Sequence, residues 1–359
     1  MELKYHNIVL RDMEERDIDD EIRWNTVQTQ WALWDAPWEM EEELSTFDPE
    51  AHRKKELEWI AKPKPDHRRS LEIDTWDGVH LGAVNCYCID GDCNWLEAAP
   101  ATEEERQKAR WAVGLDICDP AYWNGGWGAQ ALAAFLRCHL DGGYAQLYTQ
   151  TWSGNVRMTA LAEKLGFREC RRKEGIRQVR GETYDALTFR LDRAAFEAYC
   201  ARPGAAVCIR PAEDPEEKEA AAASVLADLP DWFGLPDSTA EYVRVSRELP
   251  FWLAVADGRP VGFAALKETA PKTAEIYVMG VRPGLHRAGV GRRLFRALYR
   301  YAKERGYAFL QVKTVQEGRY PEYDRTNAFY RAVGFTELEC FPTLWDEWNP
   351  CQVLVMAVQ

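Results

Sequence analysis

Apolar runs and amphipathic segments follow one another in the same order twice along the chain. Each half opens with an apolar strand that meets an arginine and then an acidic segment able to start a helix, NIVLRDMEERD at 7–17 and VCIRPAEDPEE at 207–217. Two strands around an Asp-Gly turn come next, at 68–89 and 249–266. The pattern predicts two repeats that each combine strands and helices.

The second part of each repeat centres on a strand that leads into a glycine loop and a long helix with apolar periodicity. These strands are predicted at 110–118 and 273–281. Alternating residues then predict strands at 145–152 and 308–315, each followed by a helix that ends in Gly-Phe and by closing strands. The repeat is far longer than that of a solenoid, which indicates a duplication of whole domains.

The boundary between the repeats is expected at ARPGAA, residues 201–206, because Pro and Gly together break a helix and suit a short linker. The predicted domains are therefore 1–200 and 207–359. A length of 359 residues also suits two domains of ordinary size.

Composition excludes several classes of function. The formal net charge of -13 argues against a nucleic-acid-binding surface, which needs a basic face. The ten cysteines include no CxxC pair, so no metal site and no disulfide framework are expected. The charged opening MELKYHNIVLRDMEERD is not a signal sequence, and no apolar run near it approaches the roughly 20 residues that span a bilayer. A cytoplasmic protein with reduced thiols and no membrane partner is expected.

Both glycine loops have the form of an anion site. VRPGLHRAGVGRRL at 281–294 and DPAYWNGGWGAQAL at 119–132 each join a strand to a helix. Such a connection places free backbone N–H groups at the positive end of a helix, where glycine lets a pyrophosphate approach. Neither loop fits the Rossmann or P-loop pattern, and a G-x-G also arises from ordinary turn chemistry.

In this context the chain resembles the GNAT superfamily of acyl-CoA-dependent N-acetyltransferases, twice and over essentially its whole length. The family loop Gln/Arg-x-x-Gly-x-Gly/Ala is matched by His286, Gly289 and Gly291, with His in place of Gln or Arg. The resemblance implies an α+β fold, two tandem domains that each have a mixed, mostly antiparallel sheet flanked by helices and a V-shaped coenzyme A cleft. It implies acetyl-CoA as the cofactor, held in the second repeat by Met279, Val281, His286, Arg287, Ala288, Gly289, Val290, Gly291, Arg292 and Tyr323.

The first repeat resembles the branch that includes ribosomal-protein N-terminal acetyltransferases and some aminoglycoside acetyltransferases. The coenzyme-binding residues implied there are Trp123, Asn124, Gly125, Gly126, Trp127, Gly128 and Asn155. No basic residue lies in this loop. Since a charged hydrogen bond contributes roughly 1.5–3 kcal/mol, weaker binding is expected than in the second repeat.

Acyl transfer to an amine needs a neutral amine, a stabilised oxyanion and a proton for the leaving thiolate. The family implies direct attack in a ternary complex, with a tyrosine four residues before the Gly-Phe as the acid. Tyr330 stands at that position, and its register favours the acid role over that of a packed aromatic, whereas the first repeat has Ala162 there. Glu275 and Asp116, on the central strands, are the candidate bases, with an exposed strand-end carboxylate as the alternative for Glu275.

Tryptophans and carboxylates mix in the segments where the family grips its acceptor. Aromatic faces beside acids bind ammonium groups, but tryptophans are also often simply packed. The candidate acceptor-binding residues are Trp34, Asp35, Trp38, Asp231, Trp232 and Phe233.

The predicted function is acetyl transfer from acetyl-CoA to a primary amine of a small cationic molecule, with catalysis in the second repeat. An aminoglycoside acceptor is one alternative, and a protein N-terminus is another. A third makes the first repeat a degenerate module that binds coenzyme or supports the second. The acceptor, the acyl chain length and the formation of a homodimer are left open.

Overall fold

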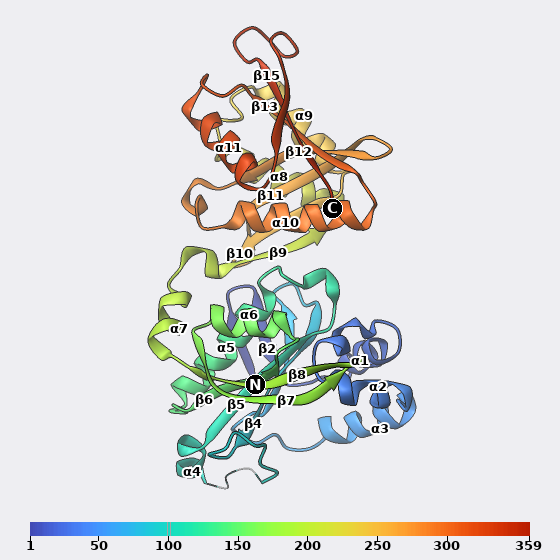
Figure 1. The fold of residues 1–359 in the computed structure, drawn as a ribbon, viewed down its shortest axis with the longest axis vertical. Helices are drawn as coiled ribbons and strands as arrows, with labels where there is room; N and C mark the ends of the chain where they lie inside the picture. Colours follow the sequence, from blue (N-terminus) through green and yellow to red (C-terminus); the bar gives the residue numbers. More distant parts are fainter. Residues whose placement is uncertain (99, 101) are drawn as a thin grey trace. The chain divides into compact units, whose positions relative to one another are not determined.

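The computed structural model describes residues 1–98, 100 and 102–359 and divides the chain into two compact units, Met1–Ala206 and Val207–Gln359 (Figure 1). The predicted linker residues 203–206 form a short 3-10 helix, Pro203–Ala206. The Gln130 side chain donates to the carbonyl of Ala205, and the Asn7 side chain donates to that of Ala206. These residues are therefore attached to the N-terminal unit.

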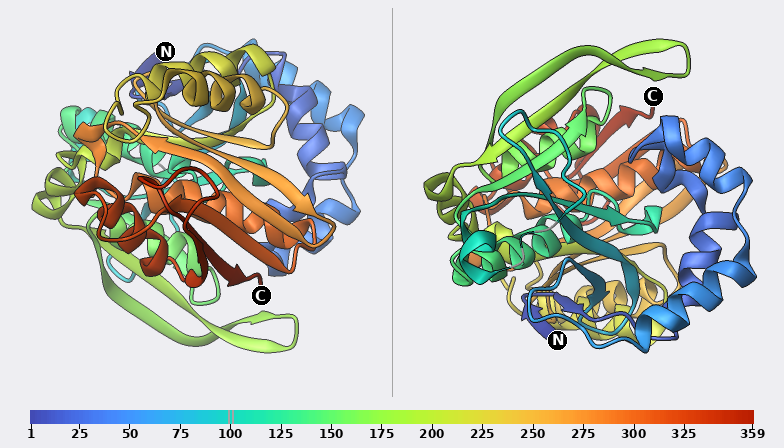
Figure 2. Two further views of the ribbon diagram at one scale, coloured as in Figure 1. Left: turned by 90° about the horizontal axis from the view of Figure 1, so that it is seen from above. Right: turned by 90° about the horizontal axis from the view of Figure 1, so that it is seen from below.

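The N-terminal unit contains an eight-stranded sheet in the order β1-β2-β3-β4-β5-β6-β8-β7. Its strands are β1 (Glu2–Tyr5), β2 (Ile8–Arg11), β3 (Ser70–Thr75), β4 (His80–Ile89), β5 (Arg110–Ile117), β6 (Leu147–Trp152), β7 (Phe167–Val179) and β8 (Glu182–Leu191). Its α-helices are α1 (Asp17–Thr26), α2 (Pro37–Ser45), α3 (Pro49–Ile60), α4 (Glu103–Lys108), α5 (Trp127–Asp141), α6 (Val156–Lys164) and α7 (Arg193–Cys200). Strands β7 and β8 form a long hairpin at one edge of the sheet, and β7 contacts α2 and α6 (Figure 2).

The C-terminal unit contains a seven-stranded sheet in the order β14-β15-β13-β12-β11-β10-β9. Its strands are β9 (Val207–Ala212), β10 (Phe251–Ala256), β11 (Arg259–Ala270), β12 (Thr273–Val281), β13 (Phe309–Val315), β14 (Thr336–Phe341) and β15 (Cys351–Ala357). Its α-helices are α8 (Pro215–Leu226), α9 (Pro236–Ser246), α10 (Val290–Glu304) and α11 (Pro321–Ala332).

One long helix follows the glycine loop in each unit and covers the sheet. Helix α10 packs against β9 to β12, and its buried Leu294 and Leu298 contribute to the core of the C-terminal unit. Helix α5 packs against β1, β2, β4 and β5, with Leu132 and Leu136 fully buried. The apolar periodicity of both helices arises because one face lies on the sheet.

Each sheet has one parallel pair at its centre, and that pairing is short. Strands β5 and β6 pair only at Trp111–Leu147 and Ala112–Tyr148, although both strands continue. Strands β12 and β13 pair from Thr273–Phe309 to Glu275–Gln311 and then separate. The two strands therefore diverge toward the glycine loop in each unit, which produces the V-shaped opening of the expected fold.

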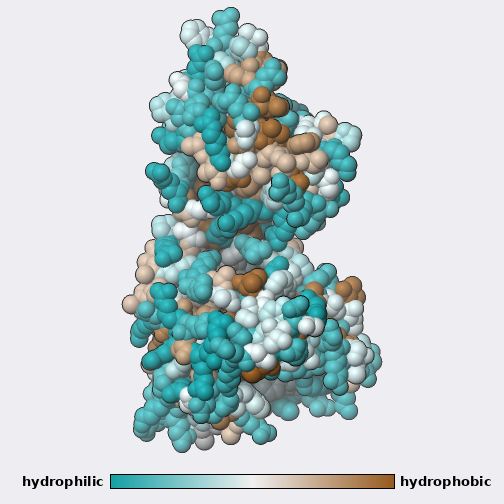
Figure 3. Space-filling view, viewed as in Figure 1, coloured by the Kyte–Doolittle hydropathy of each residue, from teal (hydrophilic) through white to brown (hydrophobic). Residues whose placement is uncertain are grey.

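Hydrophilic side chains cover much of the face seen in Figure 3, with small hydrophobic patches between them. Among the described residues no helix has the length and apolar character required to cross a bilayer.

Candidate functional site

The glycine loop of the C-terminal unit carries two residues with left-handed backbone. Arg287 has φ 63° and Gly289, the N-cap of α10, has φ 82°. A Cβ placed on Gly289 would meet no atom within 4 Å, so the space beside this residue is open, although its φ favours glycine. The unpaired first-turn N–H groups of a 15-residue helix begin here. The loop thus fits a phosphate group in shape and polarity.

The loop of the N-terminal unit follows the same backbone path. Asn124 has φ 62° and Gly126, the N-cap of α5, has φ 96°. The left-handed positions are two residues apart in both loops, and both helices contain 15 residues. The two loops therefore present equivalent main-chain groups despite their different side chains.

Aromatic ring nitrogens attach each loop to the end of its strand. Trp123 Nε1 donates to the carbonyl of Ile117 at 2.5 Å, and His286 Nε2 lies 2.7 Å from the carbonyl of Val281. Because a carbonyl only accepts, Nε2 of His286 carries the hydrogen. Both predicted residues thus brace the loop through their side chains.

Several other predicted loop residues serve packing. A Cβ on Gly291 would lie 3.5 Å from Met279, and one on Gly128 would lie 3.1 Å from Leu115. Helix and sheet therefore approach closely at these glycines. Val290 and Trp127 are buried, as is Gly125, while Met279, Val281 and Ala288 pack against the core. Arg287 and Arg292 are exposed, and Arg293 donates to the carbonyl of Val207.

Tyr330, the predicted acid, lies on α11 with 7% of its surface exposed. Its ring contacts those of Phe329 and Phe335. Burial raises its pKa well above the usual range, and the nearby Tyr242 and Tyr323 add to this shift. The hydroxyl therefore keeps its proton at neutral pH, as a proton donor must.

Tyr242 on α9 joins the predicted residues of this unit and is missing from the sequence-based predictions. Its ring lies 5.4 Å from that of Tyr277 and 5.9 Å from that of Phe233. Burial and then the charge of Glu275 raise its pKa. The sequence of α9 gives no signal of this placement, because it depends on how the helix packs against its neighbours.

The segment with Asp231, Trp232 and Phe233 is attached to the first turn of α11. The Tyr323 hydroxyl donates to the Trp232 carbonyl at 2.8 Å, and Trp232 Nε1 donates to Thr326 Oγ1 at 3.0 Å. Burial raises the pKa of Tyr323 to about 12. Asp231 is exposed, whereas Trp232 also contacts the His286 ring at 5.7 Å. The candidate acceptor segment and the coenzyme loop are therefore in contact.

Glu275, a predicted base, is buried at the last position where β12 pairs with β13. Its Oε2 accepts hydrogen bonds from Lys313 Nζ at 2.8 Å and Gln311 Nε2 at 3.0 Å. The ammonium group compensates its charge, so a proton taken up by Glu275 would have to compete with this ion pair.

In the N-terminal unit the structure brings a predicted base and a predicted acceptor residue together. Asp116 lies four residues beyond the last pair of β5 with β6, on the diverging part of the strand. Burial raises its pKa well above the ordinary value, and the carboxylate of Asp35 raises it further. Desolvation also raises the pKa of Asp35, with smaller contributions from Glu39 and Glu43. This cleft therefore disfavours negative charge, as a site for a cation would.

Asn155 connects the candidate acceptor segment to α6. Its Oδ1 accepts from the Met158 N–H and caps the helix, while its Nδ2 donates to the Trp34 carbonyl at 2.5 Å. Trp152 Nε1 donates to the same carbonyl at 3.1 Å, and the Trp38 ring meets the Trp152 ring edge-on at 6.2 Å. The Trp34 main chain and the Trp38 ring are thus held in place by α6 and β6. Ala162, also on α6, is fully buried.

A basic side chain does lie at the N-terminal loop, contrary to the sequence-based expectation. The Arg157 guanidinium lies 4.1 Å from the centre of the Trp123 ring and 4.5 Å from that of Trp34. It comes from α6, about 30 residues after the loop, so the loop sequence itself contains no trace of it. The positive charge expected from the loop is supplied by another helix.

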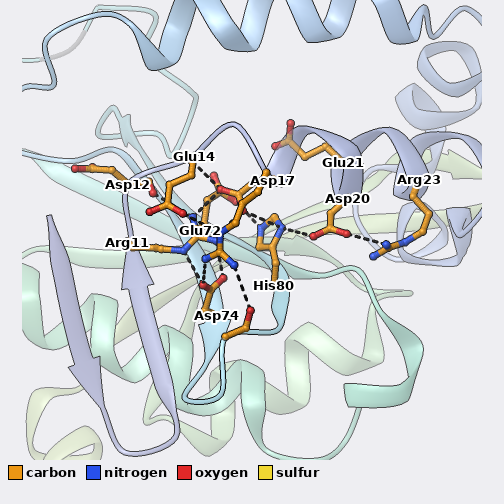
Figure 4. Close-up of polar contacts among 12 residues, drawn as sticks. Arg11, Asp12, Glu14, Asp17, Asp20, Glu21, Arg23, Glu72, Asp74 and His80 are labelled. Atoms are coloured by element: carbon orange, nitrogen blue, oxygen red, sulfur yellow. Dashed lines mark hydrogen bonds and ion pairs between the residues drawn. The ribbon is translucent and has the colours of Figure 1, made fainter.

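A network of charged side chains joins β2 and β3 to α1 (Figure 4). Arg11 bonds both carboxylate oxygens of Asp17 and both of Asp74, at 2.6–2.7 Å. His80 contacts Glu72 at 3.1 Å and Asp20 at 3.2 Å. Because these charges are fully paired, the network holds the start of α1 against the sheet, and we assign it a structural role.

Glu21 stands at the edge of the network, where its Oε2 lies 2.8 Å from His52 Nε2. Burial and then the charges of Glu72 and Glu56 raise its pKa to about 8. Burial raises the pKa of the Cys118 thiol, which follows β5. The charges of four acids raise it further: Asp116, Glu72, Glu21 and Asp35. The two groups of acids therefore flank the same strand end.

Comparisons with known proteins agree with this architecture. A family model described as "Acetyltransferase (GNAT) family" matches residues 216–335, and one described as "Acetyltransferase (GNAT) domain" matches residues 7–168. The chain belongs to the GNAT acetyltransferases. This GNAT chain is 35% identical over 85 residues to N-alpha-acetyltransferase RimI of Mycobacterium tuberculosis. The match covers 23% of the chain and 49% of that relative, so the chain spans about half the length of the curated relative it matches.

Solved structures of other acetyltransferases resemble parts of this GNAT chain. The ribosomal-protein-S18-alanine N-acetyltransferase from Escherichia coli is 18% identical, with a TM-score of 0.35, over 42% of this chain and 94% of that one. An aminoglycoside 6'-N-acetyltransferase complexed with coenzyme A is 16% identical, with a TM-score of 0.34, over 42% and 97%.

Proposed function

We propose that this acetyltransferase transfers an acetyl group from acetyl-CoA to a primary amine of a small cationic molecule. The observation that supports it most is the loop at Gly289, where left-handed backbone, an open space and a helix N-terminus meet at the wide end of a split sheet. The coenzyme supplies the acetyl thioester. The loop would hold its pyrophosphate through main-chain N–H groups, as would the matching loop at Gly126.

In the proposed reaction the amine nitrogen attacks the thioester carbonyl, a C–N bond forms and the C–S bond breaks. Tyr330 would give its hydroxyl proton to the departing sulfur, since its raised pKa keeps it protonated. The amine must lose a proton first or during attack. Glu275 is the candidate acceptor for this proton in the C-terminal unit. Its Oε2, which accepts from Lys313 Nζ, would exchange that hydrogen bond for the proton.

A cationic acceptor is favoured by the acids of the N-terminal unit. The charge of Asp35 disfavours ionisation of Asp116, and a bound ammonium group would relieve that repulsion. Tryptophan faces and carboxylates together suit amines with several positive charges, so an aminoglycoside is the more specific alternative.

The N-terminal unit has no tyrosine at the acid position, because Ala162 stands there and is buried. A second candidate role for this unit is therefore coenzyme binding without catalysis. Its loop geometry, equivalent to that of the C-terminal unit, and the guanidinium of Arg157 favour retained binding.

A screen for thiol release tests these proposals. The full chain is mixed with acetyl-CoA and a panel of mono- and polyamines, aminoglycosides included, and released coenzyme A is measured. Gly289→Val and Gly126→Val each force a branched side chain onto left-handed backbone and disable one loop at a time. Gly284→Ala is the control, because its Cβ would meet nothing within 4 Å and its φ is not left-handed.

We expect amine-dependent release that Gly289→Val abolishes and Gly126→Val leaves largely intact. Release lost only with Gly126→Val would move catalysis to the N-terminal unit. The absence of release with every amine would contradict the acceptor class, and the absence of acetyl-CoA binding by calorimetry would contradict the coenzyme.

A further inference from the structure

Three side chains with metal-binding donors meet inside the N-terminal unit, away from the acyl-transfer site. One ring nitrogen each of His67 and His139 and the Sγ of Cys86 all lie within 4.8 Å of one another. His67 precedes β3, Cys86 lies on β4 and His139 lies in the last turn of α5. Since α5 is about 22 Å long, this cluster lies at the far end of the helix from the glycine loop.

Both imidazoles have a buried ring nitrogen with no hydrogen-bond partner among the described residues. His139 Nδ1 lies 2.9 Å from the carbonyl of Phe135 and must therefore carry the hydrogen, which leaves a lone pair on Nε2. Among the residues that the structure describes, the buried Nε2 atoms of His139 and His67 have no hydrogen-bond partner. A hydrogen bond from one ring nitrogen to a carbonyl is the usual way to orient the other toward a metal.

The two histidines are neutral at physiological pH. Burial lowers the pKa of His67 to about 4, with a further contribution from His139, and burial also lowers the pKa of His139. Neutral imidazole is the form that binds metals, so no proton has to leave either ring. Burial raises the pKa of the Cys86 thiol to about 12, so that group is protonated without a metal.

The surroundings would both support a metal and leave room for a fourth ligand. Trp111 and Tyr144 lie 4.7 and 4.8 Å from the His67 ring and restrain its orientation. A cavity of about 330 Å³ is lined by both histidines and by Cys138 and Glu103, among others. It has space for a water molecule beside the two histidines.

We propose that His67, Cys86 and His139 form a binding site for a zinc-type divalent cation. Two imidazoles and one thiolate suit Zn²⁺, which takes such ligands at about 2.0–2.3 Å, and the donors need only a small inward movement to reach it. Binding forms one metal–sulfur and two metal–nitrogen bonds and releases the thiol proton of Cys86 to solvent. The metal would join the segment before β3 to β4 and α5 and stabilise the unit. The sequence-based expectation of no metal site relies on the spacing of nearby cysteines. Such spacing cannot reveal ligands that are as far apart in the sequence as His67 and His139.

Cobalt binding to the full, untagged and reduced chain is the first test. Co²⁺ bound to a thiolate absorbs in the near ultraviolet, and the titration is expected to end at one ion per chain. Calorimetry with Zn²⁺ in buffers of different ionisation enthalpy should give close to one proton released per ion. Neither result depends on acetyltransferase activity.

Matched variants locate the site. Cys86→Ser should remove the thiolate band, and His139→Gln should weaken Zn²⁺ binding by about 100-fold or more, because even outer partners of a metal ligand contribute 10- to 100-fold. Cys88→Ser, a buried thiol on the same strand outside the cluster, should bind as the wild type does.

The wild-type measurement overturns the proposal if no thiolate band appears at one equivalent of Co²⁺. A band that persists unchanged in Cys86→Ser, or one that disappears equally in Cys88→Ser, also overturns it. Circular dichroism of each variant separates loss of the site from loss of the fold.

Discussion

The carboxylate of Asp35 raises the pKa of Asp116, although the two residues are 81 positions apart in the sequence. One belongs to the segment expected to bind the acceptor and the other to the central strand. A positive charge bound near these two carboxyl groups would favour ionisation of Asp116.

Replacing Asp35 by Asn is expected to lower the pKa of Asp116 and to weaken binding of cationic amines. The charge that opposes ionisation of Asp116 is removed, while burial continues to raise its pKa. A carbon-detected NMR titration of the Asp116 carboxyl measures the shift. Asp231→Asn, in the other unit, serves as the control, and an unchanged titration of Asp116 would disprove the coupling.

Glu21→Gln is expected to stabilise the protein at alkaline pH. The folded pKa of Glu21, about 8, is above the ordinary value of 4.5, so the folded form binds the proton more tightly than the unfolded form does. Its stabilising contribution is full below pH 4.5 and is lost as the pH rises to about 8. The amide keeps a neutral hydrogen-bonding group beside His52.

The melting temperature at pH 9 should therefore rise in Glu21→Gln by about 2–4 °C for each kcal/mol gained. At pH 4 the variant and the wild type should melt alike. A variant that melts lower than the wild type at pH 9 would contradict the raised pKa.

Tyr330→Phe is expected to reduce turnover by about 100-fold or more, the usual contribution of a positioned acid. The ring remains in the core, so folding and acetyl-CoA affinity should change little. Steady-state kinetics and calorimetry measure the two quantities. Tyr299→Phe is a matched control, because the Tyr299 hydroxyl is hydrogen-bonded to the main chain of Gln359, and equal turnover in both variants would exclude Tyr330 as the acid.

Arg157→Met is expected to destabilise the N-terminal unit by about 0.5–2 kcal/mol, since the guanidinium no longer stacks on two indole rings. In a Gly289→Val background, where only the N-terminal loop remains, it should also weaken acetyl-CoA binding. Calorimetry and thermal melts measure both effects. Arg177→Met removes a guanidinium 4.4 Å from Trp38 and should leave coenzyme binding unchanged.

The repeated architecture could be predicted from the sequence because each element has a local signal. Strand β13 lies where alternating residues predict a strand, and Gly126 and Gly289 take the left-handed backbone that only glycine adopts readily. Arg157, Tyr242 and the partner of Glu275 could not be predicted in this way. Each meets its neighbours through the packing of separate helices and strands, and residue type alone does not specify such contacts.

The matched backbone of the two loops has a consequence for how the halves of this chain can change. A binding surface made of main-chain N–H groups is insensitive to most side-chain replacements, as long as the two left-handed positions persist. His286 and Trp123 already perform one bracing task with different chemistry. Substitutions can therefore change the acceptor of one half, or abolish its catalysis, while the main-chain site that would hold a coenzyme is kept in both halves.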